Sequence, residues 1–142
     1  VDTNIKLLEE YLKEKKENEK AFIGKEDSPE NIALKDKLEQ YVITNKIYTN
    51  PSLTIFELAK GLNLSSYELS FFLNKHLNRN FFDFINEYRI KDAMEMLRNP
   101  DKKSLTVLEI LYEVGFNSKS SFNTAFKKYT GLTPTEYKKK PH

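Results

Sequence analysis

The chain of 142 residues contains no cysteine and only two histidines, His76 and His142. The absence of cysteine excludes disulfide bonds, thiolate nucleophiles and thiolate metal ligands. With two imidazoles far apart in the sequence, a zinc site or a histidine-based catalytic triad would need unusual partners. We therefore expect no metal, no cofactor and no enzymatic activity.

Glycine and proline are also scarce, with four and five residues, and no apolar run is long enough to cross a membrane. The sequence shows no signal peptide either. Phenylalanine and tyrosine are abundant instead, at 10 and 8 residues. This composition predicts a folded, all-α protein. Because the sequence starts at Val1, we expect it to be a segment of a longer protein.

Charge is unevenly distributed along the chain, although the net charge is only +2. Residues 1–37 carry ten acids and eight lysines, whereas residues 115–142 carry six lysines and one acid, Glu136. No acid occurs from residue 117 to residue 135. This local excess of positive charge predicts that one face near the C-terminus meets phosphate groups.

Residues 1–30 are predicted to form a connector helix and a linker, ahead of a domain of residues 31–142. Ile5, Leu8 and Leu12 recur at three- and four-residue steps, which indicates a short helix between residues 4 and 22. The apolar stripe is too short for a coiled coil to be assigned. Two interpretations stay open: a solvated connector, or part of a dimerising or signal-carrying stalk.

Further helices are predicted from their start signals. Residues 24–28 form the expected linker, and Ser28 followed by proline begins a helix that runs to about Lys46. Four later segments are capping boxes, in which a hydroxyl and a glutamate three residues on satisfy free N–H groups. These boxes predict helices over residues 55–61, 66–77, 107–114 and 134–139. Asn80 begins a longer helix, over residues 81–98.

Residues 54–84 are repeated in residues 106–137. Leu58 aligns with Ile110 at an offset of 52, and after one inserted residue Leu69 aligns with Phe122 at an offset of 53. This duplication predicts two helix-turn-helix units, residues 54–78 and 106–131, joined by the helix over residues 81–98. Left-handed backbone is expected at the turns and helix ends of both units, at Asn63, Asn78, Gly115 and Gly131.

The second helix of each unit, over residues 66–77 and 119–130, has an apolar side and a polar side. Helical spacing places four residues on the outward side of the first: Tyr67, Ser70, Phe71 and Asn74. It places four on the outward side of the second, between Lys119 and Lys128 at the flanks: Ser120, Asn123, Thr124 and Lys127. Small polar side chains let a helix approach base edges, and asparagine, serine, threonine and lysine can bond there. The two helices are therefore predicted to read DNA.

Two segments carry a resemblance to a known family: residues 57–97, ELAKGLNLSSYELSFFLNKHLNRNFFDFINEYRIKDAMEML, and residues 110–139, ILYEVGFNSKSSFNTAFKKYTGLTPTEYKK. The second contains G-F-x-S-x-S-x-F-x-x-x-F-K-K-x-x-G-x-T-P. Over about residues 38–140 the chain resembles the C-terminal DNA-binding domain of the AraC/XylS family of bacterial transcription regulators. The resemblance implies two helix-turn-helix units whose second helices enter adjacent major grooves of double-stranded DNA.

By position, the resemblance implies base-reading roles for seven residues: Tyr67, Ser70, Phe71, Lys119, Ser120, Ser121 and Thr124. Asn74 and Asn123 join them from the helical faces. Phe71 and Thr124 depart from the family, in which many members carry arginine there, so guanine reading at these two points is in doubt. Phe71 either contacts a thymine methyl group or packs on the N-terminal helix.

Phosphate contacts are expected from basic residues beside the reading faces, namely Lys75, Arg79, Lys127, Lys128 and the lysines at 138–140. Arg89 is expected to form an internal ion pair with Asp92 or Glu57, and His76 to be a hydrogen-bonded packing residue.

The expected function is sequence-specific DNA binding by the output domain of a regulator, with RNA polymerase as a further partner. We expect a sensor domain elsewhere in the full-length chain, a monomeric isolated domain, and a cytoplasmic location, either free or as the cytoplasmic part of a membrane-anchored regulator. The alternative is a helical protein-interaction or adaptor domain that does not bind DNA.

Overall fold

A computed structural model describes residues 5–14, 28–102 and 104–141 of the chain. Within these residues the regular structure is helical throughout, which confirms the expected all-α fold. Residues 5–14 are helical, and Ile5, Leu8 and Leu12 are more than half exposed. The rest of the predicted connector helix and residues 24–27 of the predicted linker lie outside the described residues.

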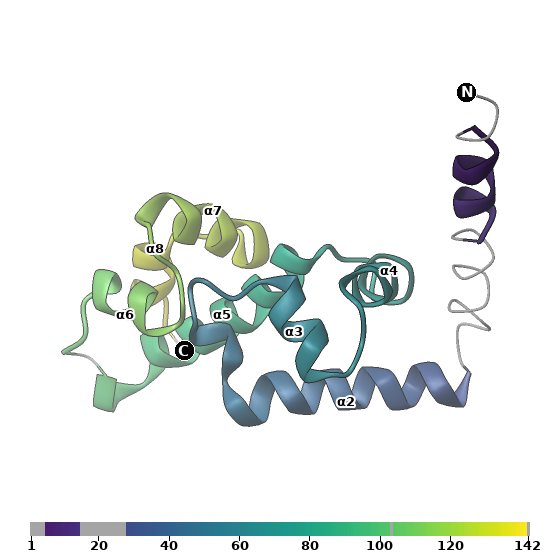
Figure 1. Cartoon of the computed structure of the whole chain (residues 1–142). Coiled ribbons are helices and arrows are strands. Elements are labelled where there is room, and N and C mark those ends of the chain that lie inside the picture. The colour runs from purple at the N-terminus through teal and green to yellow at the C-terminus, as the bar shows by residue number, and fades with distance from the viewer. Residues whose placement is uncertain (1–4, 15–27, 103, 142) are drawn as a thin grey trace.

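Seven α-helices follow, and their bounds agree closely with the capping signals. They are α2 (Pro29–Asn45), α3 (Ile55–Gly61), α4 (Ser66–His76), α5 (Phe81–Arg98), α6 (Val107–Glu113), α7 (Lys119–Thr130) and α8 (Pro134–Lys139). Two short 3₁₀ helices, η1 (Ile47–Thr49) and η2 (Pro100–Lys102), were not predicted. Figure 1 shows α5 in the middle of the molecule, with helices α2 to α4 on one side of it and helices α6 to α8 on the other.

The predicted caps form as hydrogen bonds. Ser65, Thr106 and Thr133 each accept from the backbone N–H three residues on, and the glutamate there accepts from the cap's own N–H. Thr54 accepts from the Glu57 N–H at 3.2 Å. The N–H that Thr133 donates to Glu136 also lowers the pKa of that carboxyl group. Each cap satisfies N–H groups that the helix itself leaves unpaired.

Left-handed backbone occurs at all four expected positions. The φ angles are 59° at Asn63, 55° at Asn78, 112° at Gly115 and 77° at Gly131. A fifth position, Lys46 with φ 47°, caps α2 and begins η1. Lysine is not a residue that signals this conformation in a sequence.

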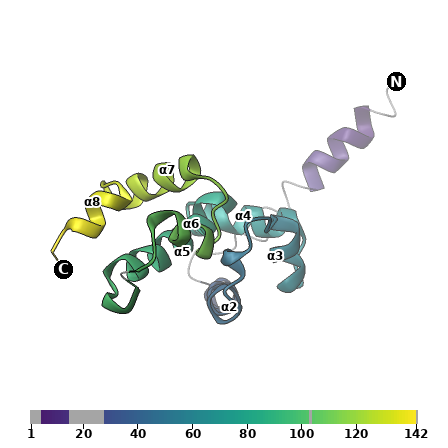
Figure 2. The ribbon, with the colours of Figure 1, turned by 90° about the vertical axis from the view of Figure 1, so that its left-hand side faces the viewer.

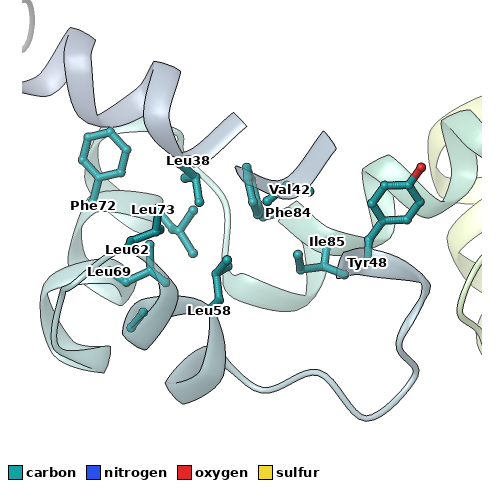
Figure 3. Packing of buried hydrophobic residues seen from close by; sticks show 11 residues of the cluster. Leu38, Val42, Tyr48, Leu58, Leu62, Leu69, Phe72, Leu73, Phe84 and Ile85 are labelled. Atoms are coloured by element: carbon teal, nitrogen blue, oxygen red, sulfur yellow. The ribbon is translucent and has the colours of Figure 1, made fainter. Parts of the chain in front are cut away.

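The buried apolar side chains form two separate cores. The first joins α2, η1, α3 and α4 to the first half of α5, through residues such as Leu38, Leu58, Leu69 and Phe84 (Figure 3). The second joins α6, α7 and α8 to the second half of α5; its buried members include Ile90, Ala93, Leu97, Ile110, Phe122 and Phe126. The two helix-turn-helix units therefore each have a core, and α5 takes part in both.

Arg89 lies on α5 between the two cores and is only 8% exposed. The expected ion pair is wrong: no carboxylate contacts Arg89 within the described residues, and Asp92 instead accepts from the Tyr48 hydroxyl at 3.1 Å. Arg89 donates from Nε to the Tyr48 carbonyl at 2.6 Å and from Nη2 to the Asn50 carbonyl at 2.9 Å. Backbone carbonyls accept the hydrogen bonds of the guanidinium but do not neutralise its charge, and burial lowers the pKa of Arg89.

His76 is partly buried, as expected. Its Nε2 lies 3.4 Å from Asn31 Nδ2, and its ring packs 5.2 Å from the ring of Phe72. The contact with Asn31 joins the start of α2 to the end of α4, so His76 has a packing role.

Candidate nucleic-acid interface

The helix α7 presents a small, polar face to solvent. Phe122 and Phe126 are fully buried in the second core, whereas Ser120, Asn123, Thr124 and Lys127 are exposed. Ser118 begins the helix by accepting from the Ser121 N–H at 3.2 Å, and its hydroxyl donates to Ser121 Oγ at 3.0 Å. The aromatic anchors therefore fix which side of α7 faces outward, as predicted.

A surface hollow runs along each side of α7. One hollow, of about 600 Å³, is lined by Lys119, Asn123 and Lys127 together with the starts of α6 and α8. The other, of about 350 Å³, is lined by Ser120, Ser121, Thr124 and Lys128 together with Asp83 and Asn86 of α5. The exposed face of α7 is thus a ridge between two depressions. The helix itself runs along the outer side of the second unit (Figure 2). A ridge of this kind can enter a groove.

The equivalent face of α4 is less open. Asn74 is exposed, but Tyr67 and Ser70 are only partly exposed, and Asn74 Nδ2 donates to the Ser70 carbonyl at 2.8 Å. Phe71, which helical spacing places on the outward side of α4, is only 8% exposed, and its ring lies 6.2 Å from that of Tyr67. The outward direction of this side chain is therefore not an exposed position, because removing a phenyl ring from water lowers the free energy.

The basic residues chosen as phosphate contacts divide into two groups. Lys75 and Lys127 are exposed, and no ion pair is recorded for either within the described residues. Lys128 is paired with Asp83 at 3.0 Å, and Arg79 is paired with Glu87. Lys138 donates to the Leu105 carbonyl at 3.3 Å. Three of these cations therefore already hold a partner within the domain.

Sequence reasoning missed the part that α5 plays beside α7. Asp83 and Asn86 line the hollow along α7, and Tyr129 at the end of α7 donates to the Asp83 carbonyl at 2.6 Å. The burial of Tyr129 and the nearby Asp83 raise the pKa of its hydroxyl. The position of an acid at the start of a helix is ordinary, so the sequence carried no signal that Asp83 faces α7.

The two units differ in charge at matching positions. At the offset of 53, Lys119, Asn123 and Lys127 of α7 correspond to Ser66, Ser70 and Asn74 of α4. The face of α7 is therefore the more basic, while the face of α4 is neutral at the same three points. Phosphate attraction should be concentrated in the second unit.

Comparison with known proteins agrees with this geometry. The family described as helix-turn-helix domain matches residues 58–140, more than half of the chain. The chain belongs to this family, in its AraC/XylS type. The predicted resemblance is confirmed: this is a DNA-binding helix-turn-helix domain of bacterial transcriptional regulators and not an enzyme.

Relatives of this AraC-type domain are about one third identical to it over the residues that match. The Msm operon regulatory protein of Streptococcus mutans is 35% identical over 88 residues, which are 62% of this chain and 31% of that protein. The uncharacterized HTH-type transcriptional regulator YdeC of Bacillus subtilis is 33% identical over 87 residues, 61% of this chain and 29% of that protein. The chain thus spans about a third of the length of these relatives.

Solved structures show the same arrangement of helices. The C-terminal domain of AraT, a response regulator from Geobacillus stearothermophilus, superposes with a TM-score of 0.63 at 30% identity, covering 78% of this chain and 84% of that one. The C-terminal domain of the response regulator yesN from Fusobacterium nucleatum gives 0.60 at 29% identity, covering 79% and 100%.

The described helices include none that is both long and apolar enough to span a membrane. Nor does the described part of the chain bring together three histidine or acidic side chains that could hold a metal ion.

Proposed function

We propose that this AraC-type domain binds double-stranded DNA sequence-specifically, with α4 and α7 in adjacent major-groove segments on one face of the duplex. The observation that carries the proposal is the exposed face of α7, which is small, polar, free of acids and raised between two hollows. A helix with such a face can approach base edges closely, and a pair of helices about 34 Å apart matches one turn of DNA.

On α7, the proposed base-reading residues are Lys119, Ser120, Ser121, Asn123 and Thr124. Asn123 can bond adenine through both its amide atoms, and the hydroxyl groups can serve any base. On α4, the corresponding roles fall to Tyr67, Ser70 and Asn74, which the structure leaves at least partly exposed. Phe71 is only 8% exposed, so a contact of its ring with a base is not part of this proposal.

Lys75 and Lys127 are the proposed first contacts with phosphate, because they are exposed and form no ion pair with the residues that the structure describes. Lys128 and Arg79 can join them by exchanging Asp83 and Glu87 for phosphate oxygens. Each exchange breaks one charge-assisted contact, with a carboxylate, to form another, with phosphate. Lys128 and Arg79 should therefore contribute less than Lys127 to the affinity for DNA.

The domain is proposed to be the output part of a longer regulator. It spans about a third of its curated relatives, and the similar solved domains are described as C-terminal domains of response regulators. A sensor domain would then lie elsewhere in the full-length protein, which would act in the cytoplasm on its own or from a membrane anchor. Bound to DNA as a monomer through its two units, the domain would recruit or obstruct RNA polymerase.

The proposal is tested by binding to a pool of genomic DNA fragments at two salt concentrations. Each phosphate contact contributes about −0.9 to the slope of log affinity against log salt concentration, so two to four contacts give a slope of about −2 to −4. Enrichment of a shared sequence among the bound fragments is also expected. A slope near zero without enrichment would instead support the adaptor alternative.

A further inference from the structure

The helix α5 passes from one core to the other within a few residues. Ile85 is buried in the first core and Ile90 in the second, and Arg89 lies on the same helix just before this change. A cation buried at this point is costly unless its donors are satisfied. The hydrogen-bond partners of Arg89 therefore show what holds the two units together at this point, which we call the joint.

Arg89 contacts both units at once. On one side it donates to the carbonyls of Tyr48 and Asn50, in the segment whose Tyr48 side chain belongs to the first core. On the other side, its guanidinium carbon lies 5.6 Å from the centre of the Phe116 ring, which belongs to the second core. A third bond, from Nη1 to Asn86 Oδ1 at 3.1 Å, holds the guanidinium against α5. The planar guanidinium of Arg89 thus contacts the segment of Tyr48 and Asn50, the ring of Phe116 and α5 itself.

Gly115 completes the joint. Its φ angle is 112°, and a Cβ atom there would collide with the Tyr48 carbonyl and lie 2.8 Å from Arg89 Nε. The matching turn of the first unit has Asn63, with φ 59°, and is exposed. The second turn therefore packs backbone to backbone on the first unit, whereas Gly61 at the first turn packs against a side chain, that of Tyr41 on α2.

We propose that Arg89 is a positioning residue for DNA recognition: it fixes the orientation of α7 relative to α4 and so sets which spacing of the two half-sites the domain accepts. The inference rests on the proposed reading of DNA by both helices. Two linked units can occupy two half-sites of DNA at once only when the distance and orientation of the units match those of the half-sites. A joint that is already ordered before binding also loses less conformational entropy on binding. No direct contact of Arg89 with DNA is involved.

The test compares Arg89→Met with Arg98→Met, which removes the same charge from an exposed position at the end of the same helix. Both are measured on the DNA site enriched from the genomic pool and on the same site with 5 base pairs inserted between its halves. Half a turn moves the second half-site to the opposite face. The insertion should lower the affinity of the unaltered chain and of Arg98→Met about 100-fold. Arg89→Met should bind the original site more weakly, and the insertion should lower its affinity less than about tenfold.

A second measurement follows the joint without DNA. Since the chain has no cysteine, Lys60→Cys on α3 and Glu113→Cys on α6 allow one spin label to be placed on each unit at exposed positions. The distribution of distances between the labels should be narrow in the chain with Arg89 and clearly broader with Arg89→Met. If Arg89→Met does not fold, Arg89→Lys replaces it, because lysine keeps the charge but not the fork.

Equal loss of affinity on insertion in Arg89→Met and Arg98→Met, with label distributions of equal width, would overturn the positioning role while leaving DNA binding intact. Absence of sequence-specific binding by the unaltered chain would overturn the proposed function, and the inference with it. The two failures are therefore distinguishable.

Discussion

At the residue scale, the exposed side of α7 mixes side chains suited to two different tasks. Ser120 and Thr124 are short and polar and lie one turn apart, whereas Lys127 carries its charge on a long, flexible stem. Short hydroxyl groups can reach only base edges that the helix already faces, while lysine reaches the phosphates beside the groove. The two kinds of residue should therefore respond differently to removal.

We expect Thr124→Ala to change the preference at one base position by about 1 to 3 kcal/mol, and Lys127→Ala to weaken all sequences about equally and reduce the salt slope by about 1. Competition between single-base variants of the enriched site measures the first, and a salt titration the second. Lys35→Ala is the control, because Lys35 lies on α2, on the opposite side of the molecule from α7 (Figure 2). Unchanged preference in Thr124→Ala would remove this residue from the reading set.

Tyr48 gives a pH-dependent contribution to stability. Its burial, and next the charge of Asp92, raise its pKa to about 12, compared with about 10 for free tyrosine. A raised folded-state pKa means that the stabilisation is complete below pH 10 and is lost as the pH rises through 12. In Tyr48→Phe, the free energy of unfolding should therefore decrease less steeply between pH 10 and 12 than in the unaltered chain.

Urea unfolding at pH 9, 10 and 11 measures this difference. Tyr112→Phe is the matched control, since Tyr112 is 55% exposed. A slope with pH that is the same in Tyr48→Phe and Tyr112→Phe would show that the Tyr48 hydroxyl is not held in its neutral form by the fold.

At the scale of elements, helix starts were the most predictable features. Ser65, Thr106 and Thr133 carry their own signal, because the cap and its glutamate are three residues apart and need no distant partner. The 3₁₀ helix η1 and left-handed Lys46 carried no such signal. The carbonyls of Tyr48 and Asn50 accept from Arg89 some forty residues away, and a backbone carbonyl has no identity in a sequence.

The two glycines with positive φ provide a paired prediction about turns. At Gly131, nothing lies within 4 Å of an added Cβ atom, so Gly131→Ala meets only the cost of left-handed backbone, about 1 to 2 kcal/mol. At Gly115 the same substitution also meets the Tyr48 carbonyl and Arg89. We expect Gly115→Ala to lower the free energy of unfolding by at least about 3 kcal/mol.

Thermal or urea unfolding of the two variants checks this order. Equal losses at the two positions would mean that the backbone of the second turn does not press on the first unit. Such a result would also weaken the case for a tight joint at Arg89.

At the scale of the whole molecule, the duplicated sequence predicted the two units and the helix between them, because residues 54–84 and 106–137 share one pattern. The exposed face of α7 was also predictable, since Phe122 and Phe126 orient it from within the same helix. The face of α4 was predicted less well. Helical spacing gives the direction of Phe71 but not its burial, which leaves the side chain only 8% exposed.

The separation of the two cores has a consequence for how such a protein can change over generations. A substitution that alters packing in one core leaves the packing of the other in place, so each unit is a largely independent target for selection. Lys119 and Lys127 of α7 stand where α4 has Ser66 and Asn74, as expected of two copies of one pattern that have already diverged. One unit can therefore acquire a new DNA preference while the other unit still binds its original half-site.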